Sequence, residues 1–539
     1  MRSVRPTVVA LVVLLLAACS PANNTARPAP PTSEQPRPGG TLVIGASADP
    51  ACADWYLPCG ASFWGLRALG LQTLPTPVEF VDNQYRTSAL LASDPRVDPG
   101  PPQRVTYHIN PAAVWSDGVP ITSADFKYSW EQGKATNFRA TADIADVDDS
   151  DPATAVVTFT QATASWRDRF RPILPKHLLQ GKDRNTELKD GYRFSGGPWI
   201  LDHWTRGQEI RLVRNPRYWG KPANLDAVVF RIIPDSAAYI QAYKAGQVDM
   251  IYLPAAPEAA ELKDLPNTAY DVDPSLTYAY VTFNTQRAPL DSRAVRQALA
   301  YATDREAIVK QLFGSLQPDI RPADAVMSPA NREWYVEPFA RYRRDLAKVN
   351  DLMRADGWTR PAGGVWAKAD TPAKVEIKMG PGQKVNDLTA QILQSQWKEA
   401  GFDVSIVTSS AASAEATRGN FSVGLGSWAA GSTDPELCAF FCSANIPTEA
   451  NGFQGMNASR IASPALDDAW QRVNAELDPA KRKELVRRGQ ELLADEVPVL
   501  PLAGLPVAYA ASASKVGGPL TSNPAFLRLS DWFCKSACG

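Results

Sequence analysis

Alternating and helical patterns of apolar residues follow one another along most of this chain. Apolar and polar residues alternate over 104–109, which is the period of a half-buried strand, and 154–160 is predicted as another strand. Shorter β-forming runs predict three more strands, at 41–44, 210–213 and 227–233. Apolar positions at helical spacing predict helices over 236–245, 291–313, 388–400 and 479–496.

One more helix is predicted to begin near Thr122. The segment Thr122-Ser-Ala-Asp125 resembles a capping box, whose polar side chains satisfy the free N–H groups of a first helical turn. We expect this helix to run through Trp130. Strands interleaved with helices over such a length favour an α/β protein. No repeat of fixed period is visible, which argues against a solenoid.

The first residues have the pattern of an export signal. Arg2 and Arg5 precede an apolar stretch over 8–16, and Leu16-Ala-Ala-Cys19 follows it. This order predicts a signal peptide over 1–18, since the stretch is shorter than the ~20 residues that span a membrane. A cysteine directly after small residues resembles a bacterial lipobox, so we predict lipidation of Cys19. An ordinary signal peptide with a chance cysteine is the alternative.

A proline-rich segment over 19–39 separates this signal from the first predicted strand. It is also rich in Ser, Thr, Asn and Gln and poor in apolar residues. Such a composition cannot bury a core, so we expect an extended tether.

Composition and charge restrict the possible partners. The chain has 539 residues, 45% of them hydrophobic, and a formal net charge of −1. That length predicts at least two lobes, and the near-neutral charge argues against a nucleic-acid partner. No later stretch is long and apolar enough to span a membrane. We therefore expect a protein held at the outer face of the cytoplasmic membrane by its lipid.

Six further cysteines form three local pairs in the sequence. In an exported protein, an even number of cysteines at short spacing predicts disulfides. A zinc site made from two pairs is the alternative, although zinc ribbons favour closer spacing. The expected disulfides are Cys52–Cys59, Cys438–Cys442 and Cys534–Cys538.

No catalytic motif is visible. The chain lacks a nucleophile elbow, a zinc-protease helix motif and a phosphate-binding loop, and it has only three histidines. We therefore expect neither an enzyme nor a bound cofactor or metal. An acidic cluster over 143–151 suggests calcium, but it lacks the glycine and terminal glutamate of an EF-hand loop, so we expect a solvated loop there. Most of the 15 tryptophans should pack in cores, with Trp428 the first candidate for a ligand pocket.

Several segments in a fixed order resemble the peptide and nickel family of solute-binding proteins, which serve ATP-driven importers. The resemblance extends over residues 40–532, and its order and number of matching blocks make it specific. The clearest blocks are Trp115-Ser-Asp-Gly-Val-Pro-Ile-Thr-Ser-Ala-Asp-Phe-Lys-Tyr-Ser-Trp130, Gly196-Gly-Pro-Trp199, Arg214-Asn-Pro-Arg-Tyr-Trp-Gly220, Ala245-Gly-Gln-Val-Asp-Met250 and Arg293-Ala-Val-Arg-Gln-Ala-Leu-Ala-Tyr-Ala302.

The resemblance implies a two-lobed clamshell that encloses its ligand. The first lobe would comprise 40–75, 190–280 and 495–539, with an extra subdomain over 76–189. The second lobe would comprise 281–494. The two crossings between the lobes would lie at 277–284 and 497–502.

The resemblance also implies how a peptide would be held. An extended peptide would add to a protein strand, here Gly426-Ser-Trp-Ala429, and would contact the loop between Cys52 and Cys59. The family's usual aspartate for the peptide ammonium would fall at Gly431, which is a departure. Asp434 either takes over that role or caps the following segment.

The function implied is capture of di- to oligopeptides and delivery to the transmembrane subunits of an ABC permease. We expect a monomer. Two alternatives stay open: the same fold binding haem or a metal chelate, and a scaffold or regulator of envelope enzymes that does not transport.

Overall fold

The computed structural model describes residues 38–539 except 58, 61, 82–83, 137, 255–256, 430–433, 454, 520–528, 537 and 539. The predicted signal peptide, Cys19, most of the predicted tether and Gly431 lie outside the described residues. Among the helices described, none combines the length and the apolar character needed to cross a bilayer.

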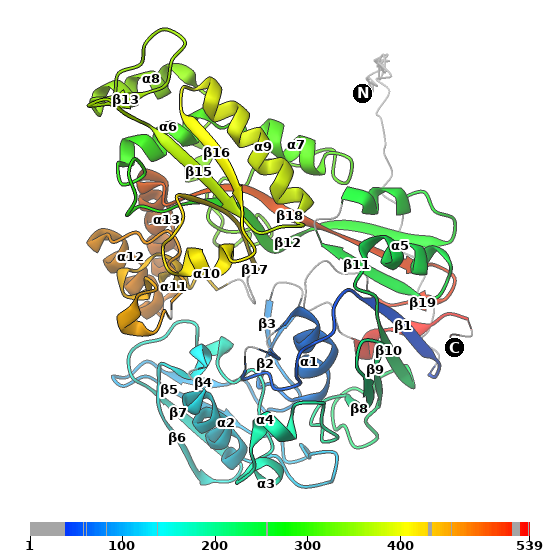
Figure 1. The fold of residues 1–539 in the computed structure, drawn as a ribbon. Coiled ribbons are helices and arrows are strands. Elements are labelled where there is room, and N and C mark those ends of the chain that lie inside the picture. The colour runs from blue at the N-terminus through cyan, green and yellow to red at the C-terminus, as the bar shows by residue number, and fades with distance from the viewer. Residues whose placement is uncertain are drawn as a thin grey trace, which may run out of the picture. The chain divides into compact units, whose positions relative to one another are not determined.

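One large mixed sheet runs through the described chain (Figure 1). In spatial order its ten strands are β16 (Asp403–Thr408), β15 (Lys374–Met379), β17 (Val423–Ala429), β12 (Thr268–Phe283), β18 (Val499–Ser512), β11 (Met250–Pro254), β1 (Thr41–Ala46), β10 (Ala227–Ile232), β9 (Glu209–Arg214) and β8 (Trp199–Thr205). All five strands predicted from the sequence are present: β1, β9 and β10 in this sheet, and β5 (Arg104–His108) and β7 (Thr154–Phe159) in a smaller one.

Two long antiparallel strands, β12 and β18, lie at the centre of this sheet. Residues 268–274 of β12 pair with 506–512 of β18, and residues 278–282 pair with 499–504 beyond a shift in register. An irregularity of this kind bends and twists a strand pair locally. The two predicted crossing segments are the second half of β12 and the beginning of β18.

The first hydrophobic core is built around β1, β10 and β11 and extends into a smaller sheet. That sheet has the order β4 (Arg96–Asp98), β5 (Arg104–His108), β7 (Thr154–Phe159) and β6 (Ile144–Asp151), and α2 (Ser123–Ala135) packs against β6 and β7. The capping box of Thr122 and Asp125 that starts α2 is present as predicted. A hairpin of β2 (Val78–Val81) and β3 (Gln84–Thr87) lies beside it, and the remaining helices of this region are α1 (Leu71–Thr73), α3 (Lys176–Leu179), α4 (Arg184–Glu187) and α5 (Ser236–Lys244).

The acidic cluster over 143–151 forms a strand, contrary to the solvated loop expected from its charge. It is β6, the edge strand of the small sheet, and it pairs only with β7. Charged residues are common on edge strands because they discourage pairing with another chain. No group of three or more metal-ligating side chains occurs among the described residues, this cluster included.

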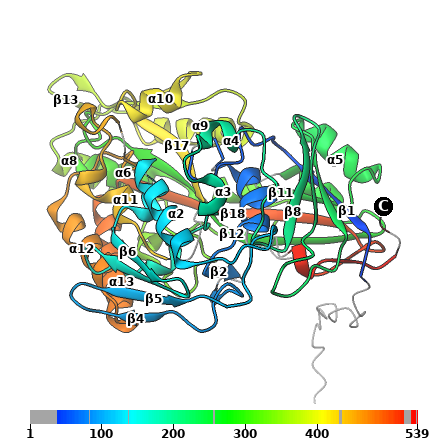
Figure 2. The same ribbon diagram turned by 90° about the horizontal axis from the view of Figure 1, so that it is seen from below.

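A second, separate core lies between residues 281 and 503. Its helices are α6 (Arg293–Ala302), α7 (Arg305–Phe313), α8 (Leu346–Ala355), α9 (Lys384–Glu399), α10 (Ala412–Thr417), α11 (Cys438–Phe441), α12 (Pro464–Ala475) and α13 (Pro479–Glu496). Helices α12 and α13 pack closely, since a Cβ on Gly489 would lie only 2.9 Å from the Trp470 ring. Figure 2 shows these helices from below.

The single helix expected over 291–313 is in fact two helices. The chain breaks at Thr303 and Asp304, where the Asp304 side chain accepts a hydrogen bond from the N–H of Ala307 and caps α7. Thr303 in turn accepts a bond from the Trp397 indole at 2.9 Å. An aspartate inside a helical apolar pattern was the sign of this second start.

All three expected disulfides are present, namely Cys52–Cys59, Cys438–Cys442 and Cys534–Cys538. Most tryptophans pack in the cores as expected. Those that are fully buried include Trp115, Trp199, Trp366, Trp397, Trp470 and Trp532.

A buried arginine joins the second core to β18. Arg305 bonds to the Asp324 carboxylate at 2.6 Å and to the Pro501 carbonyl on β18 at 3.2 Å. It also donates to three further carbonyls, of Ala323, Phe339 and Tyr342.

We predict that Arg305→Met lowers the free energy of unfolding by about 2–3 kcal/mol, because it removes the donor to four buried carbonyls and leaves Asp324 with Arg343 as its remaining arginine partner. The control is Arg341→Met, since the Arg341–Asp495 pair is 41% and 50% exposed. Its loss should cost less than about 1 kcal/mol. Urea unfolding measures both, and equal effects would contradict this assignment.

Candidate functional site

The strand expected to bind a peptide, β17, has one edge that is only partly paired. On one side it pairs with β12 along its whole length, from Val423 opposite Phe283 to Ala429 opposite Thr277. On the other side it pairs with β15 only at Val423 and Gly424. Within the described chain, no strand pairs with this second edge beyond that point.

The register shows which backbone groups face the open edge. The N–H of Asn284 donates to the carbonyl of Ser422 at 2.9 Å, so these two residues are a hydrogen-bonded pair. Hydrogen-bonded pairs alternate along an antiparallel ladder, so Gly426 and Trp428 bond to β12. Ser427 and Ala429 therefore direct their N–H and C=O groups to the open edge, which is the arrangement that a further strand requires.

Aromatic side chains surround this strand. The rings of Trp428 and Phe440 lie edge to face, with centroids 4.0 Å apart. Tyr280, opposite Gly426 on β12, covers that glycine, and a Cβ there would lie 3.2 Å from the tyrosine ring. Gly426 thus leaves room for the hydroxyl end of this ring, and Trp428 keeps part of its surface accessible.

The second predicted contact region, the loop between Cys52 and Cys59, is fixed by an ion pair with Arg184 of α4. Asp54 is buried and accepts two bonds from Arg184, at 3.0 and 2.7 Å. The other Asp54 oxygen accepts the N–H of Tyr56 at 3.0 Å. In the described residues this loop makes no hydrogen bond to β17. The two predicted contact regions are therefore each fixed by their own neighbours and not by one another.

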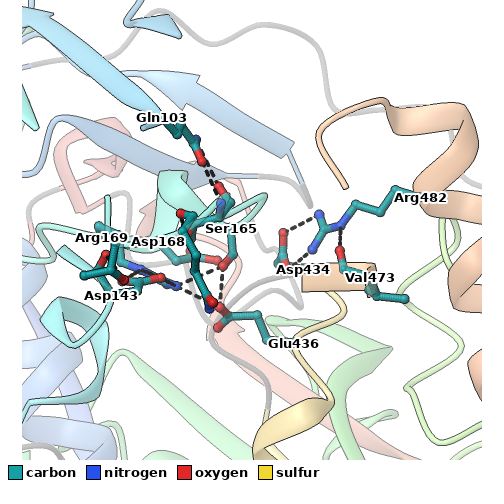
Figure 3. Close-up of polar contacts among 12 residues, drawn as sticks. Gln103, Asp143, Ser165, Asp168, Arg169, Asp434, Glu436, Val473 and Arg482 are labelled. Carbon is teal, nitrogen blue, oxygen red and sulfur yellow. Dashed lines mark hydrogen bonds and ion pairs between the residues drawn. The ribbon is translucent and has the colours of Figure 1, made fainter. Parts of the chain in front are cut away.

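A polar network connects the two core regions near the end of β17 (Figure 3). Arg169, from the segment after β7, donates to Asp143 at 2.6 Å and to Glu436 at 2.9 Å. Ser165 also donates a short hydrogen bond to Glu436. Burial lowers the pKa of Arg169, but Glu436 and Asp143 outweigh it and raise the pKa above its usual value, so this guanidinium stays charged.

Backbone contacts hold the same segment in place. The N–H of Ala164 donates to the carbonyl of Asn474, at the end of α12, at 2.8 Å. The buried Gln103 side chain bonds to both the N–H and the carbonyl of Thr163, at 2.6 and 3.2 Å. Residues 163–169 therefore lie against the second core region in a defined arrangement.

Asp434 lies on the other side of this network, in a two-pronged ion pair with Arg482 (Figure 3). The two bonds measure 2.8 and 2.7 Å, and the Arg482 Nε donates to the carbonyl of Val473. The Asp434 and Arg482 side chains are only 8% and 7% exposed. Burial raises the pKa of Asp434 to about 6, against the lowering effect of Arg482.

The candidate residues from the sequence fall into two groups. The first group lies together on β17 and consists of consecutive residues, Gly426, Ser427, Trp428 and Ala429. Asp434 lies in the ion pair described above, and the sequence reasoning missed its partner Arg482 and the pair Arg169–Glu436. These residues are far apart in the sequence and belong to no local motif, so only the folded chain shows that they meet.

Comparison with known proteins gives the family. A family model described as bacterial extracellular solute-binding proteins, family 5, middle region, matches residues 88–446. Protein XP55 of Streptomyces lividans is 27% identical over 460 residues, which cover 84% of this chain and 81% of XP55. The oligopeptide-binding protein OppA of Mycobacterium tuberculosis is 27% identical over 452 residues, which cover 79% of this chain and 72% of OppA.

A solved structure agrees on the fold. The periplasmic EDTA-binding protein EppA superimposes with a TM-score of 0.83 at 20% identity, over 94% of this chain and 98% of EppA. Members of this family bind solutes outside the cytoplasm for ABC importers and are not enzymes. The mixed α/β fold, its large sheet and the match over residues 88–446 together show that this chain belongs to family 5 of the bacterial extracellular solute-binding proteins.

Proposed function

We propose that this protein captures short peptides, from dipeptides to oligopeptides, and delivers them to an ABC permease. The observation that carries the proposal is the open edge of β17 at Ser427 and Ala429, beside the strands that cross between the two cores. Backbone groups at such an edge bind any extended peptide without reading its side chains. The name of the M. tuberculosis relative, an oligopeptide-binding protein, supports the same ligand class.

The proposal includes a division into two lobes with the boundaries predicted from the sequence. The two separate hydrophobic cores support it. In this arrangement, the bonds of Arg169 and Ser165 to Glu436 lie between the lobes and would favour the closed state, in which the ligand is enclosed.

The proposal also includes a lipid on Cys19 and a flexible tether before the first strand. The lipid would hold the protein at the membrane beside its permease, and the tether would let the folded part change its orientation there. We propose that the protein acts as a monomer. A sequence pattern alone supports this part of the proposal, because Cys19 lies outside the described residues.

Bound ligand is the direct test. Protein purified under mild conditions should release peptides on denaturation, detected by mass spectrometry. Release of a metal chelate or haem instead, or co-purification of envelope enzymes with an empty site, would contradict the peptide proposal.

We predict that Ser427→Pro weakens binding of a short peptide by about tenfold or more, because it removes an N–H at the open edge and adds a ring there. Stability should change little, since Ser427 makes no ladder bond to β12. Ser427→Ala is the control and should bind normally. Calorimetric titration measures all three proteins, and unchanged affinity in the proline variant would exclude strand addition at this edge.

We predict that Asp434 attracts the ammonium of the ligand, with Arg482 fixing its carboxylate. Asp434→Asn should then weaken binding of a free-amine peptide by about 2 kcal/mol, while the N-acetylated form of that peptide binds both proteins alike. The exposed Glu449→Gln is the matched control. If Asp434→Asn affects both peptides equally, Asp434 serves only the ion pair with Arg482.

We predict that Cys19→Ala releases the protein from the membrane fraction without changing its peptide affinity. Fractionation followed by immunoblotting measures the first effect, and titration of the soluble protein measures the second. Retention at the membrane would point to an anchor other than a lipid on Cys19.

A further inference from the structure

A cavity of about 430 Å³ is lined by residues of the first core region, and none of them belongs to β17. Its lining comes from residues 55–90, 171–172, 196–198, 218–221 and 530–531, so the second core region contributes nothing to it. Its size is within the range of small-molecule sites. Most of its wall is apolar, and the apolar lining includes Leu66, Leu74, Val78, Phe80, Leu90 and Trp219.

One charged side chain in this wall lacks a counter-charge. Arg67 donates only a long 3.4 Å bond to the Phe63 carbonyl and stacks on the Phe63 ring at 3.8 Å. Its Nε atom is buried and has no hydrogen-bond partner, and no acid of the described chain is among the groups that influence its charge. Burial lowers the pKa of Arg67 to about 10, despite the opposing influence of Tyr252 and Tyr509.

The other charged groups in the wall have opposite charges next to them. Lys221 pairs with Asp531 at 2.7 Å, and Arg171 pairs with Asp168 at 3.1 Å. Arg86 lies directly opposite Glu79 in the β2–β3 hairpin. Arg67 therefore gives the cavity an excess positive charge, and a buried charge without a partner is costly unless a ligand supplies one.

A second unsatisfied donor lines the same cavity. The indole Nε1 of Trp55 is buried and has no hydrogen-bond partner among the described residues. Its ring is held against Gly70, where a Cβ would lie 3.3 Å away. Arg67 itself lies in a π-helical turn, Gly65–Gly70, a backbone form that is rare and frequent at functional sites.

We infer that this cavity is a second binding site, for a small organic anion with a flat apolar body. The anionic group would accept hydrogen bonds from Arg67 and Trp55, and the apolar body would lie along the aliphatic and aromatic wall. No residue of β17 lines the cavity, so we expect a peptide bound along β17 to leave the cavity accessible.

Two fluorescent probes with similar rings test this inference. Anilinonaphthalene sulfonate carries an anionic group, and N-phenylnaphthylamine does not. The sulfonate probe should bind at one site per molecule, and saturating peptide should not displace it. Arg67→Met should weaken its binding by about tenfold or more, as expected for the loss of a charged hydrogen bond, and should leave the uncharged probe unaffected.

The controls separate this site from folding and from the peptide site. Arg354→Met, an exposed arginine of the second core region, should bind the sulfonate probe normally. The melting temperature of Arg67→Met should not fall, because the variant removes an uncompensated charge. If that variant does not fold, Trp55→Phe replaces it, since it removes only the indole donor and should weaken the sulfonate probe about threefold.

Equal binding of the sulfonate probe by the wild type and the variants would overturn the inference. Displacement of the probe by peptide would overturn it too, because the probe would then occupy the peptide site. A protein that binds no peptide but retains Arg67-dependent probe binding would contradict the proposed function and leave this second site standing.

Discussion

The pairing of β12 with β18 is the constraint on which the rest of this molecule depends. These strands contain 16 and 14 residues, and together they run from the first core region into the second. Backbone hydrogen bonds along their length place strands from both regions in one sheet. Strand β17 pairs with β12, so the position of the candidate peptide edge is set by the β12–β18 pair. The register shift between Pro274 and Tyr278 lies between the two halves and increases the bend and twist of the pair there.

Buried arginines hold the irregular segments around this sheet. Arg184 fixes the loop after Cys52, Arg169 fixes the segment after β7, and Arg482 fixes Asp434. In each case a planar guanidinium meets a carboxylate in a forked geometry that a lysine does not reproduce. Arg67 differs from all of these because it is buried beside a cavity and, within the described residues, has no acid paired with it. A buried guanidinium needs an anionic partner. The other three arginines have a carboxylate of the protein as that partner, whereas Arg67 is free to bind the anionic group of a ligand.

Local features of the fold were predictable from the sequence, and non-local ones were not. The capping box at Thr122, the helix over 479–496 and the local disulfides involve residues close in the chain, and they were predicted correctly. The prediction of one continuous helix over 291–313 was wrong, because the cap at Asp304 starts a second helix within a continuous apolar pattern. The prediction of a loop at 143–151 was wrong, because residues 144–151 pair with β7 as a strand despite their negative charge.

From the sequence alone we could identify the family, several of the strands and helices, and the short strand at 426–429 that we propose for the peptide. Each of these depends on patterns within a few residues or on blocks in a fixed order. The folded chain was needed to show that Asp434 faces Arg482, that Glu436 meets Arg169, and that Arg67 lines a cavity without an acid of the described chain paired to it. Such relations join segments that are distant along the chain, and burial, which sets their energies, exists only once the chain has folded.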